Sequence, residues 1–147
     1  MIGVERTMVT DRPAEEVLRY LADFGNTREW DPGTVRCERL DDGPVAEGST
    51  WRNVSRFRGR ESELVYRLER LSPDRLVFVG RNRTVTATDD ITVRPTGSGS
   101  TLTYHAELRF HGLARLAAPL LRGEFERLAD AVADRLPEVL ATGPGRT

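Results

Sequence analysis

One carboxylate interrupts an apolar series, which makes it the first candidate for chemistry. Asp89 shares its parity with the alternating apolar residues of a strand predicted near 84–94, namely Val85, Ala87, Ile91 and Val93. A carboxyl group that faces an apolar interior has a raised pKa, so Asp89 could act as a general acid or base or hold a ligand hydroxyl. The alternative is that Asp89 and Asp90 form a β-bulge, which would leave both side chains in water.

Two tyrosines could supply hydroxyl groups to the same interior. Tyr66 shares the parity of Leu68 on its predicted strand, and Tyr104 shares the parity of Leu102. A buried tyrosine hydroxyl needs a hydrogen-bond partner, which could be a ligand, water or another side chain. Both residues are therefore candidates for ligand binding, with the alternative that they are core residues satisfied by the protein itself.

Another candidate set lies on the strand predicted near 49–57. Its inward positions form an aromatic wall with two polar groups, made of Trp51, Asn53, Ser55 and Phe57. The residues of opposite parity are expected on the outer face and are Arg52, Arg56 and Arg58. A row of this kind is more often a solvated surface than an anion site.

Further residues complete the predicted binding site. Trp30 lies on a short helix that should close one end of the interior, with the alternative that it fills core volume. The remaining apolar residues expected at the ligand are Phe78, Leu108 and Leu120. The segment around Pro119 is expected opposite the loop at Gly59, where the two could act as a gate. Arg81 and Arg83 could meet a carboxylate or phosphate, or remain in solvent.

Several reactions find no support in the residues. His105 and His111 are the only histidines, and on one strand they would lie roughly 20 Å apart, too far to share a metal ion. His105 also has outward parity, which argues against a catalytic triad with Ser55. The Gly-Ser segment at 97–100 lacks the lysine of a phosphate-binding loop, and Cys37 has no neighbouring base in the sequence. We therefore predict no metal site and no cofactor.

The elements that position these residues follow from the hydrophobic pattern. Residues 2–10 predict a first strand. Apolar residues at helical spacing, from Ala14 to Phe24, predict a short helix with Pro13 in its first turn, capped by Asp11 or Arg12 and closed by Gly25. A second helical turn is predicted over 27–31. Turn signals then delimit six strands, predicted near 35–40, 49–57, 62–71, 75–81, 84–94 and 101–110.

The last predicted element is a long amphipathic helix that follows Gly112. Its apolar residues recur every three or four positions in one stripe, made of Leu113, Leu116, Leu120, Leu121, Phe125, Leu128, Val132, Leu136 and Val139. Pro119 and Gly123 lie in its first half, where they predict a kink or a late start.

Composition limits the number of domains and the class of partner. A chain of 147 residues with 38% hydrophobic and 31% charged content fits one domain, which we place at 1–141, before a flexible tail at 142–147. All 22 basic residues are arginine, and with 23 acidic residues they give a net charge of -1, which disfavours nucleic-acid binding. No segment resembles a signal peptide or a membrane span, so we expect a cytoplasmic protein without integral membrane association. The sequence leaves the oligomeric state open.

Together these elements predict an α+β domain with an internal cavity. A seven-stranded antiparallel sheet with one apolar face must bury that face against the long C-terminal helix, while two short helices after the first strand close one end. The twist of a long sheet carries its edges away from the helix axis, so the two surfaces cannot meet everywhere. We therefore expect a pocket between the helix and the sheet.

Three segments carry a resemblance to a known superfamily. They are Asp11-Arg12-Pro13-Ala14-Glu15-Glu16-Val17, then Leu21-Ala22-Asp23-Phe24 with Trp30-Asp31-Pro32, then Gly112-Leu113-Ala114-Arg115-Leu116 leading to Pro119-Leu120-Leu121. They resemble bacterial polyketide cyclase/dehydrase and lipid-transport proteins of the SRPBCC superfamily, which share the helix-grip fold of START and birch-pollen-allergen proteins. These are signatures of fold, so the resemblance implies a binding cavity more strongly than a reaction.

Three functions are compatible with these observations. The first is a carrier or sensor that binds a hydrophobic small molecule, such as a lipid, an isoprenoid or a polyketide, between the helix and the sheet. The second is a polyketide aromatase/cyclase or dehydrase in which Asp89 or a tyrosine moves a proton. The third is a protein-interaction module of the same fold with a filled core. The sequence does not decide whether the protein is an enzyme.

Overall fold

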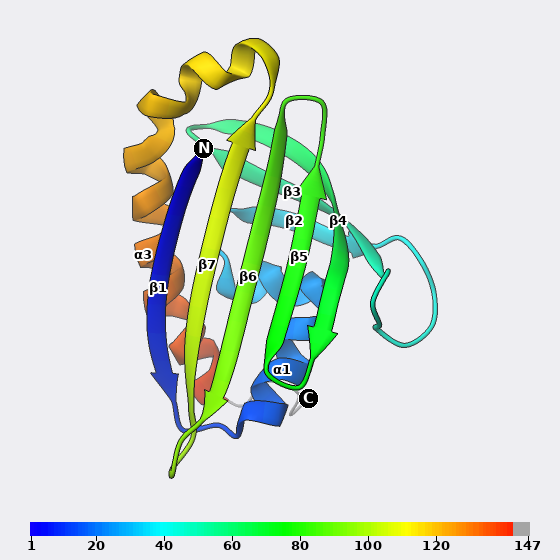
Figure 1. Ribbon diagram of the computed structural model, residues 1–147, viewed down its shortest axis with the longest axis vertical. Coiled ribbons are helices and arrows are strands. Elements are labelled where there is room, and N and C mark those ends of the chain that lie inside the picture. Colours follow the sequence, from blue (N-terminus) through cyan, green and yellow to red (C-terminus); the bar gives the residue numbers. More distant parts are fainter. Residues whose placement is uncertain (143–147) are drawn as a thin grey trace.

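A computed structural model describes residues 1–142 of the protein (Figure 1). The strands are β1 (Ile2–Thr10), β2 (Thr34–Arg39), β3 (Thr50–Phe57), β4 (Arg60–Ser72), β5 (Arg75–Arg81), β6 (Val85–Pro95) and β7 (Ser100–Phe110). The helices are α1 (Ala14–Ala22), the 3₁₀ helix η1 (Phe24–Asn26), α2 (Thr27–Trp30), the 3₁₀ helix η2 (Gly112–Ala117) and α3 (Ala118–Ala141). The predicted order is confirmed, and the strand ends shift by one or two residues. Except for Thr142, the predicted tail at 142–147 lies outside the described residues.

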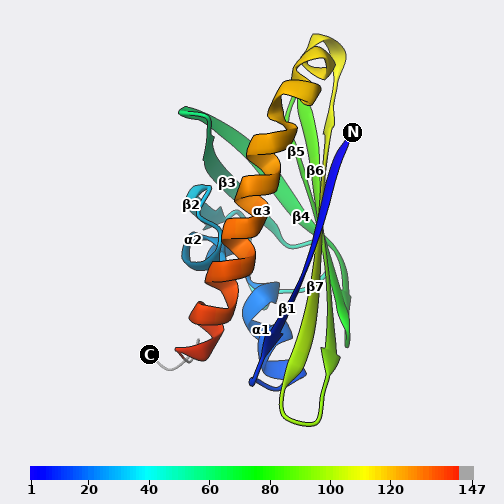
Figure 2. The ribbon, with the colours of Figure 1, turned by 90° about the vertical axis from the view of Figure 1, so that its left-hand side faces the viewer.

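The described chain forms one antiparallel sheet of seven strands in the order β1-β7-β6-β5-β4-β3-β2. Consecutive strands from β2 to β7 are neighbours, and β1 pairs with β7 at the opposite edge from β2. The sheet curves, so that β3 and β4 lean away from the direction of β1 and β7 and enclose α3 on the concave face (Figure 2). This α+β architecture is the one predicted from the sequence.

Helix α3 starts late and buries only part of the predicted stripe. Gly112 adopts a φ of 59°, η2 follows it, and Pro119 occupies the first turn of α3. The buried residues of α3 are Phe125, Ala129, Val132, Leu136 and Leu140. Within residues 1–142, no helix combines the length and the hydropathy required to cross a membrane.

The prediction of one continuous buried stripe is wrong for the first part of this segment. Leu113, Leu116 and Leu120 are exposed at 87%, 76% and 74% of their surface. A 3₁₀ helix has three residues per turn, so its apolar positions are out of phase with those of the α-helix that follows. The leucines of η2 therefore point away from the sheet.

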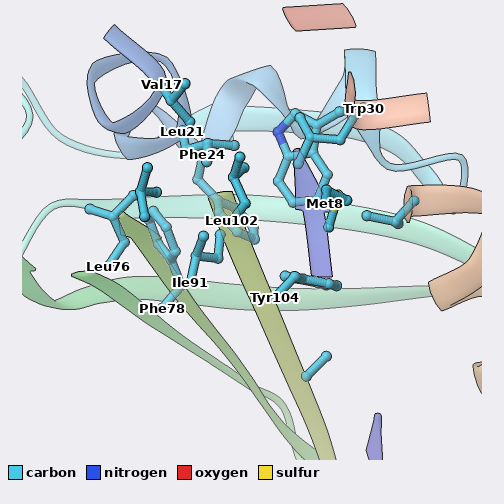
Figure 3. Packing of buried hydrophobic residues seen from close by; sticks show 14 of the residues in the cluster. Met8, Val17, Leu21, Phe24, Trp30, Leu76, Phe78, Ile91, Leu102 and Tyr104 are labelled. Atoms are coloured by element: carbon cyan, nitrogen blue, oxygen red, sulfur yellow. The ribbon is translucent and has the colours of Figure 1, made fainter. Parts of the chain in front are cut away.

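The packed core fills the half of the concave face that α1 and η1 cover. Side chains from these helices meet sheet residues in one cluster, which includes Val17, Leu21, Phe24, Leu76, Phe78, Ile91 and Leu102 (Figure 3). The rings of Phe24 and Phe78 lie 4.5 Å apart between centroids. This cluster anchors the sheet beside the site described next.

Candidate functional site

A cavity of about 570 Å³ lies between α3 and the other half of the concave face. Its apolar sheet wall comes from β3, β4, β6 and β7 and includes Phe57, Leu64, Val85, Ala87, Ala106, Leu108 and Phe110. Its helix wall is made of Ala117, Leu121, Phe125, Leu128, Ala129 and Val132. The volume is in the range of small-molecule sites, roughly 300–1,000 Å³.

Small side chains keep this half of the interior open. Ala87 on β6 and Ala106 on β7 lie on neighbouring strands, and Ala129 of α3 lines the same space. In the packed half, the inward position two residues beyond Asp89 on β6 is instead Ile91, which is 1% exposed. Packed interiors leave few voids larger than a water molecule. A cavity of this size therefore depends on the three small side chains in its wall.

Asp89 points into the inner end of the cavity, beside the packed core. Its neighbours on both sides are in regular register, since Phe78 and Ala106 pair with Asp89 while Val77 pairs with Asp90. The bulge considered as an alternative is therefore wrong.

The adjacent carboxylate lies on the outer face of the sheet. Asp90 accepts hydrogen bonds from Arg75, whose Nε and Nη2 atoms lie 2.9 and 2.6 Å from its two oxygens. Two consecutive carboxylates thus have opposite environments, one in the cavity and one in an ion pair at the surface.

The cavity environment holds the Asp89 carboxyl near its titration midpoint at neutral pH. The pKa of Asp89 is raised to about 7, mainly by burial and also by the charge of Asp31, while a hydrogen bond from Tyr104 acts in the opposite direction. The Tyr104 hydroxyl donates to Oδ1 of Asp89 at 3.4 Å. A carboxyl in this state can accept a proton from a bound molecule or donate one to it.

Asp31 is a second carboxylate in the cavity wall, and the sequence did not single it out as a site residue. It accepts hydrogen bonds from the Gly33 amide at 2.9 Å and from the Thr34 hydroxyl at 3.1 Å. Burial raises the pKa of Asp31, opposed by those two hydrogen bonds and by Arg135. The available signal was an aspartate before Pro32-Gly33, which also suits an ordinary helix end.

Tyr66 enters the cavity across a glycine on the neighbouring strand. Tyr66 pairs with Gly80, and a Cβ atom at Gly80 would lie 2.6 Å from the tyrosine ring. The ring also packs on Phe24, with centroids 4.4 Å apart. Gly80 therefore leaves the room in which Tyr66 lies flat against the sheet.

Four more of the predicted residues line the cavity, namely Asn53, Ser55, Phe57 and Leu108. The Asn53 side-chain amide is buried and donates to the Thr34 hydroxyl at 3.4 Å. Alternation on β3 thus predicted the inward face correctly over these positions. With Asp89, Tyr66 and Tyr104, these residues bring polar groups to a wall that is mostly apolar.

The comparison with known families agrees with this architecture. Residues 1–141 match the family described as polyketide cyclase / dehydrase and lipid transport. The chain belongs to this family. No curated protein sequence matches it.

Several solved structures share this fold at low sequence identity. The ZhuI aromatase/cyclase from Streptomyces sp. R1128 is 18% identical, with a TM-score of 0.76 over 92% of this chain and 91% of that one. A START superfamily protein from Mycobacterium smegmatis is 12% identical, with a TM-score of 0.78 over 95% and 97% of the two chains. The di-domain ARO/CYC protein BexL is 14% identical, with a TM-score of 0.69 over 93% of this chain and 49% of that one. The predicted helix-grip fold is confirmed.

In this polyketide cyclase family member, Trp51 and Phe78 do not line the cavity, contrary to the prediction. Both are completely buried, and their rings lie 5.7 Å apart between centroids. Their inward parity is as expected, but they lie under α1 and η1, where Phe24 packs against each of them. Parity alone does not distinguish the packed half of the sheet from the hollow half.

Trp30 and Leu120 are also absent from the cavity wall. Trp30 is 1% exposed and packs edge-on against Tyr104, with ring centroids 5.9 Å apart, so it fills core volume behind the cavity. Its Nε1 atom is buried and has no hydrogen-bond partner among residues 1–142. Leu120 points to solvent and Leu121 faces the cavity instead. The 3₁₀ turns of η2 before α3 rotate the helix relative to the orientation that a continuous α-helix would have.

The cavity opens between the β3–β4 hairpin and the start of α3. Arg56, Arg58 and Arg60 from the hairpin line the same space as Ala117 and Leu121 from the helical side. The two segments expected to face each other therefore do so. The expectation that Arg56 and Arg58 belong only to the outer face is wrong, because the turn at Arg58, with a φ of 55°, brings the hairpin end over the mouth.

The sequence did not predict which residues of the long helix line the cavity. Leu121, Phe125, Leu128 and Val132 were recognised as apolar positions of a long helix, and the structure places all of them at the cavity. Their three- and four-residue spacing was the available signal. It could not identify which part of the helix faces a hollow and which part faces packed side chains.

Proposed function

We propose that this family member binds a hydrophobic small molecule, of lipid, isoprenoid or polyketide type, in the cavity between α3 and the sheet, as a carrier or sensor. The observation that carries the proposal is the cavity of about 570 Å³, whose wall is mostly apolar, with Asp89 and Tyr104 at its inner end and arginines of the β3–β4 hairpin at its mouth. A core with this much open space argues against the alternative of an interaction module with a filled interior.

Burial of apolar ligand surface supplies the binding free energy. A ligand that buries about 250 Å² of apolar surface gains roughly 6 kcal/mol at 25 cal/mol per Å², before the costs of ordering. Asp89, Tyr104 and Asn53 then favour a ligand with a hydroxyl or carbonyl group at its inner end, because each offers a hydrogen bond in an apolar surrounding. The apolar body of such a ligand would lie between Ala106 and Phe125.

The test is binding of an apolar fluorescent probe, anilinonaphthalene sulfonate, together with native mass spectrometry of the purified protein. Ala106→Phe places a ring inside the cavity and should weaken probe binding by at least about tenfold, because it occupies the ligand's space. Thr88→Phe is the matched control, since Thr88 has the outward parity on β6. Equal probe affinity in wild type and Ala106→Phe would refute binding in this cavity.

A second candidate is catalysis in the same cavity, as a polyketide aromatase/cyclase or dehydrase. It is favoured by one observation, the Asp89 carboxyl with a pKa of about 7 beside the Tyr104 hydroxyl. Asp89 would take a proton from a carbon next to a carbonyl, or protonate a leaving hydroxyl. The solved structures whose names include an aromatase/cyclase activity support this substrate class.

Asp89→Asn separates the two candidates. For a catalyst acting on a poly-carbonyl substrate, this variant should keep ligand affinity within about threefold and lose turnover by at least about 100-fold. A dependence of turnover on a group titrating near neutral pH should disappear with it. Unchanged turnover would remove Asp89 from the chemistry.

A further inference from the structure

The end of the molecule around the cavity mouth exposes a group of leucines. Leu113, Leu116 and Leu120 are the most exposed large hydrophobic residues of the described chain, at 87%, 76% and 74%. Their spacing of three and four residues puts them on one side of the segment formed by η2 and the first turn of α3. Single exposed leucines are common at protein surfaces, whereas a contiguous apolar patch indicates a binding surface.

The same end of the molecule is strongly cationic. The segments 56–60, 81–84 and 109–123 contain eight arginines and no aspartate or glutamate, which leaves 14 arginines and 23 carboxylates in the rest of the chain. Among residues 1–142, Arg56 is the only one of these arginines that forms an ion pair, with Glu61. The net charge of -1 therefore hides a segregation of charge along the molecule.

These three segments lie together in space. The β5–β6 hairpin, the β3–β4 hairpin and η2 are at the same end of the molecule (Figures 1 and 2). The amide of His111, the residue before η2, donates to the carbonyl of Thr84 in the β5–β6 hairpin at 2.8 Å. This hydrogen bond joins the two segments. A hollow of about 370 Å³ is lined in part by Arg109, His111 and Arg115. These residues are neighbours in sequence of the exposed leucines, so the hollow adds a concave cationic surface to this end of the molecule.

We propose that this end of the molecule, the leucines of η2 and α3 with the surrounding arginines, docks on the surface of a membrane that contains anionic lipid. Arginine side chains would meet lipid phosphates while the leucines enter the boundary of the acyl chains, as in helices that lie in the interface. An acidic protein would satisfy the arginines, but it would also need an apolar groove that matches the exposed leucines. A bilayer surface offers both environments at once.

Docking in this orientation brings the cavity mouth to the bilayer. Ala117 and Leu121 line the cavity, while Leu116 and Leu120 lie on the outer side of the same turns. One helical segment thus separates the interior from the proposed membrane contact. An apolar ligand could pass between the acyl-chain region and the cavity without crossing bulk water.

Vesicle flotation tests the proposal. The full chain should float with vesicles of phosphatidylcholine and phosphatidylglycerol and stay in solution with phosphatidylcholine alone, and about 0.5 M salt should weaken the binding. The variant L113S/L116S/L120S should lower the partition coefficient by about 1,000-fold, because each leucine contributes about a tenfold factor when buried. Val9→Ser is the matched control, since Val9 is 71% exposed near the opposite end of β1 and should change nothing.

Three results would overturn the proposal. They are failure of the wild-type protein to float with anionic vesicles, equal binding to neutral and anionic vesicles, and equal binding by the triple-leucine variant. Association with an acidic protein but with no vesicle would likewise reject the membrane. The Ala106→Phe variant should float as wild type does, so loss of ligand binding and loss of membrane binding can be told apart.

Discussion

The two halves of the concave sheet face contrast in how they are filled. Under α1 and η1, the rings of Phe24, Trp51 and Phe78 interlock at centroid distances of 4.5 to 6.1 Å. Under the first half of α3, alanines on β6, β7 and the helix leave a cavity of about 570 Å³. Both halves belong to the same strands and have the same alternation. Side-chain size and the presence of a second covering element therefore decide which half is structural and which can bind a ligand.

The contrast extends to charge. Asp89, the only charged residue that is buried in the described part of the chain, lies in the wall of the hollow half with Asp31, and arginines line the mouth. Burying a carboxylate without a cationic partner costs stability. Retaining Asp89 in the cavity wall, where no cation offsets its burial, is a stability cost of the kind that functional sites carry.

The largest expected difference between the two halves is the loss of unfolding free energy when an aromatic side chain is truncated in each. Phe78→Ala leaves a hole in a fully buried cluster and should cost about 3–5 kcal/mol. Phe57→Ala removes a ring that already borders the cavity, so its cost should be about 1 kcal/mol. Urea denaturation of the two variants measures this difference. Equal losses would mean that the two halves are packed alike.

Removing the charge of Asp89 should stabilise the protein in a pH-dependent way. Since the folded pKa of about 7 exceeds the unfolded value, the native state binds more protons than the unfolded state between them. Wild-type stability therefore falls as the pH rises through that interval, from about 4 to about 7. Asp89→Asn should gain on the order of 4 kcal/mol at about pH 8 and little at about pH 4.

Asp90→Asn is the matched change on the outer face. It removes a partly exposed ion pair with Arg75 and should cost about 1 kcal/mol. Denaturant titrations across pH measure both variants. A stability profile for Asp89→Asn that parallels the wild type at all pH values would contradict the buried placement of this carboxyl.

A smaller loss of stability is expected where the packed half meets the cavity, at the contact between Gly80 and Tyr66. Gly80→Ala drives a methyl group against the Tyr66 ring and should cost about 2 kcal/mol while displacing the ring into the cavity. In the double variant with Tyr66→Val, most of this loss should disappear, because the clashing ring is gone. Thermal unfolding of the single and double variants measures the coupling. Additive losses would show that the two residues do not interact.

Much of this fold could be predicted from the sequence because its signals are local. Alternation on β3, β6 and β7 identified the inward set that contains Asn53, Asp89 and Tyr104, and turn residues delimited the strands. Asp89 itself was found because a carboxylate in an apolar series conflicts with its neighbours.

The rest depends on contacts between distant segments. The parity that placed Asn53 inward placed Trp51 inward as well, and only the position of α1 and η1 separates them. The outward turn of Leu120 follows from the 3₁₀ geometry of η2, which a three- and four-residue spacing cannot distinguish from an α-helix. The charge segregation at the cavity mouth was likewise hidden in a balanced composition.

The most direct test of the account is a crystal structure of the protein under xenon pressure, because xenon occupies apolar cavities in proteins. The account predicts xenon atoms between Ala87, Ala106 and Phe125, and none among the rings of Phe24, Trp51 and Phe78. A structure in which α3 packs directly on β6 and β7, with no xenon between them, would contradict the hollow half and with it the proposed ligand site.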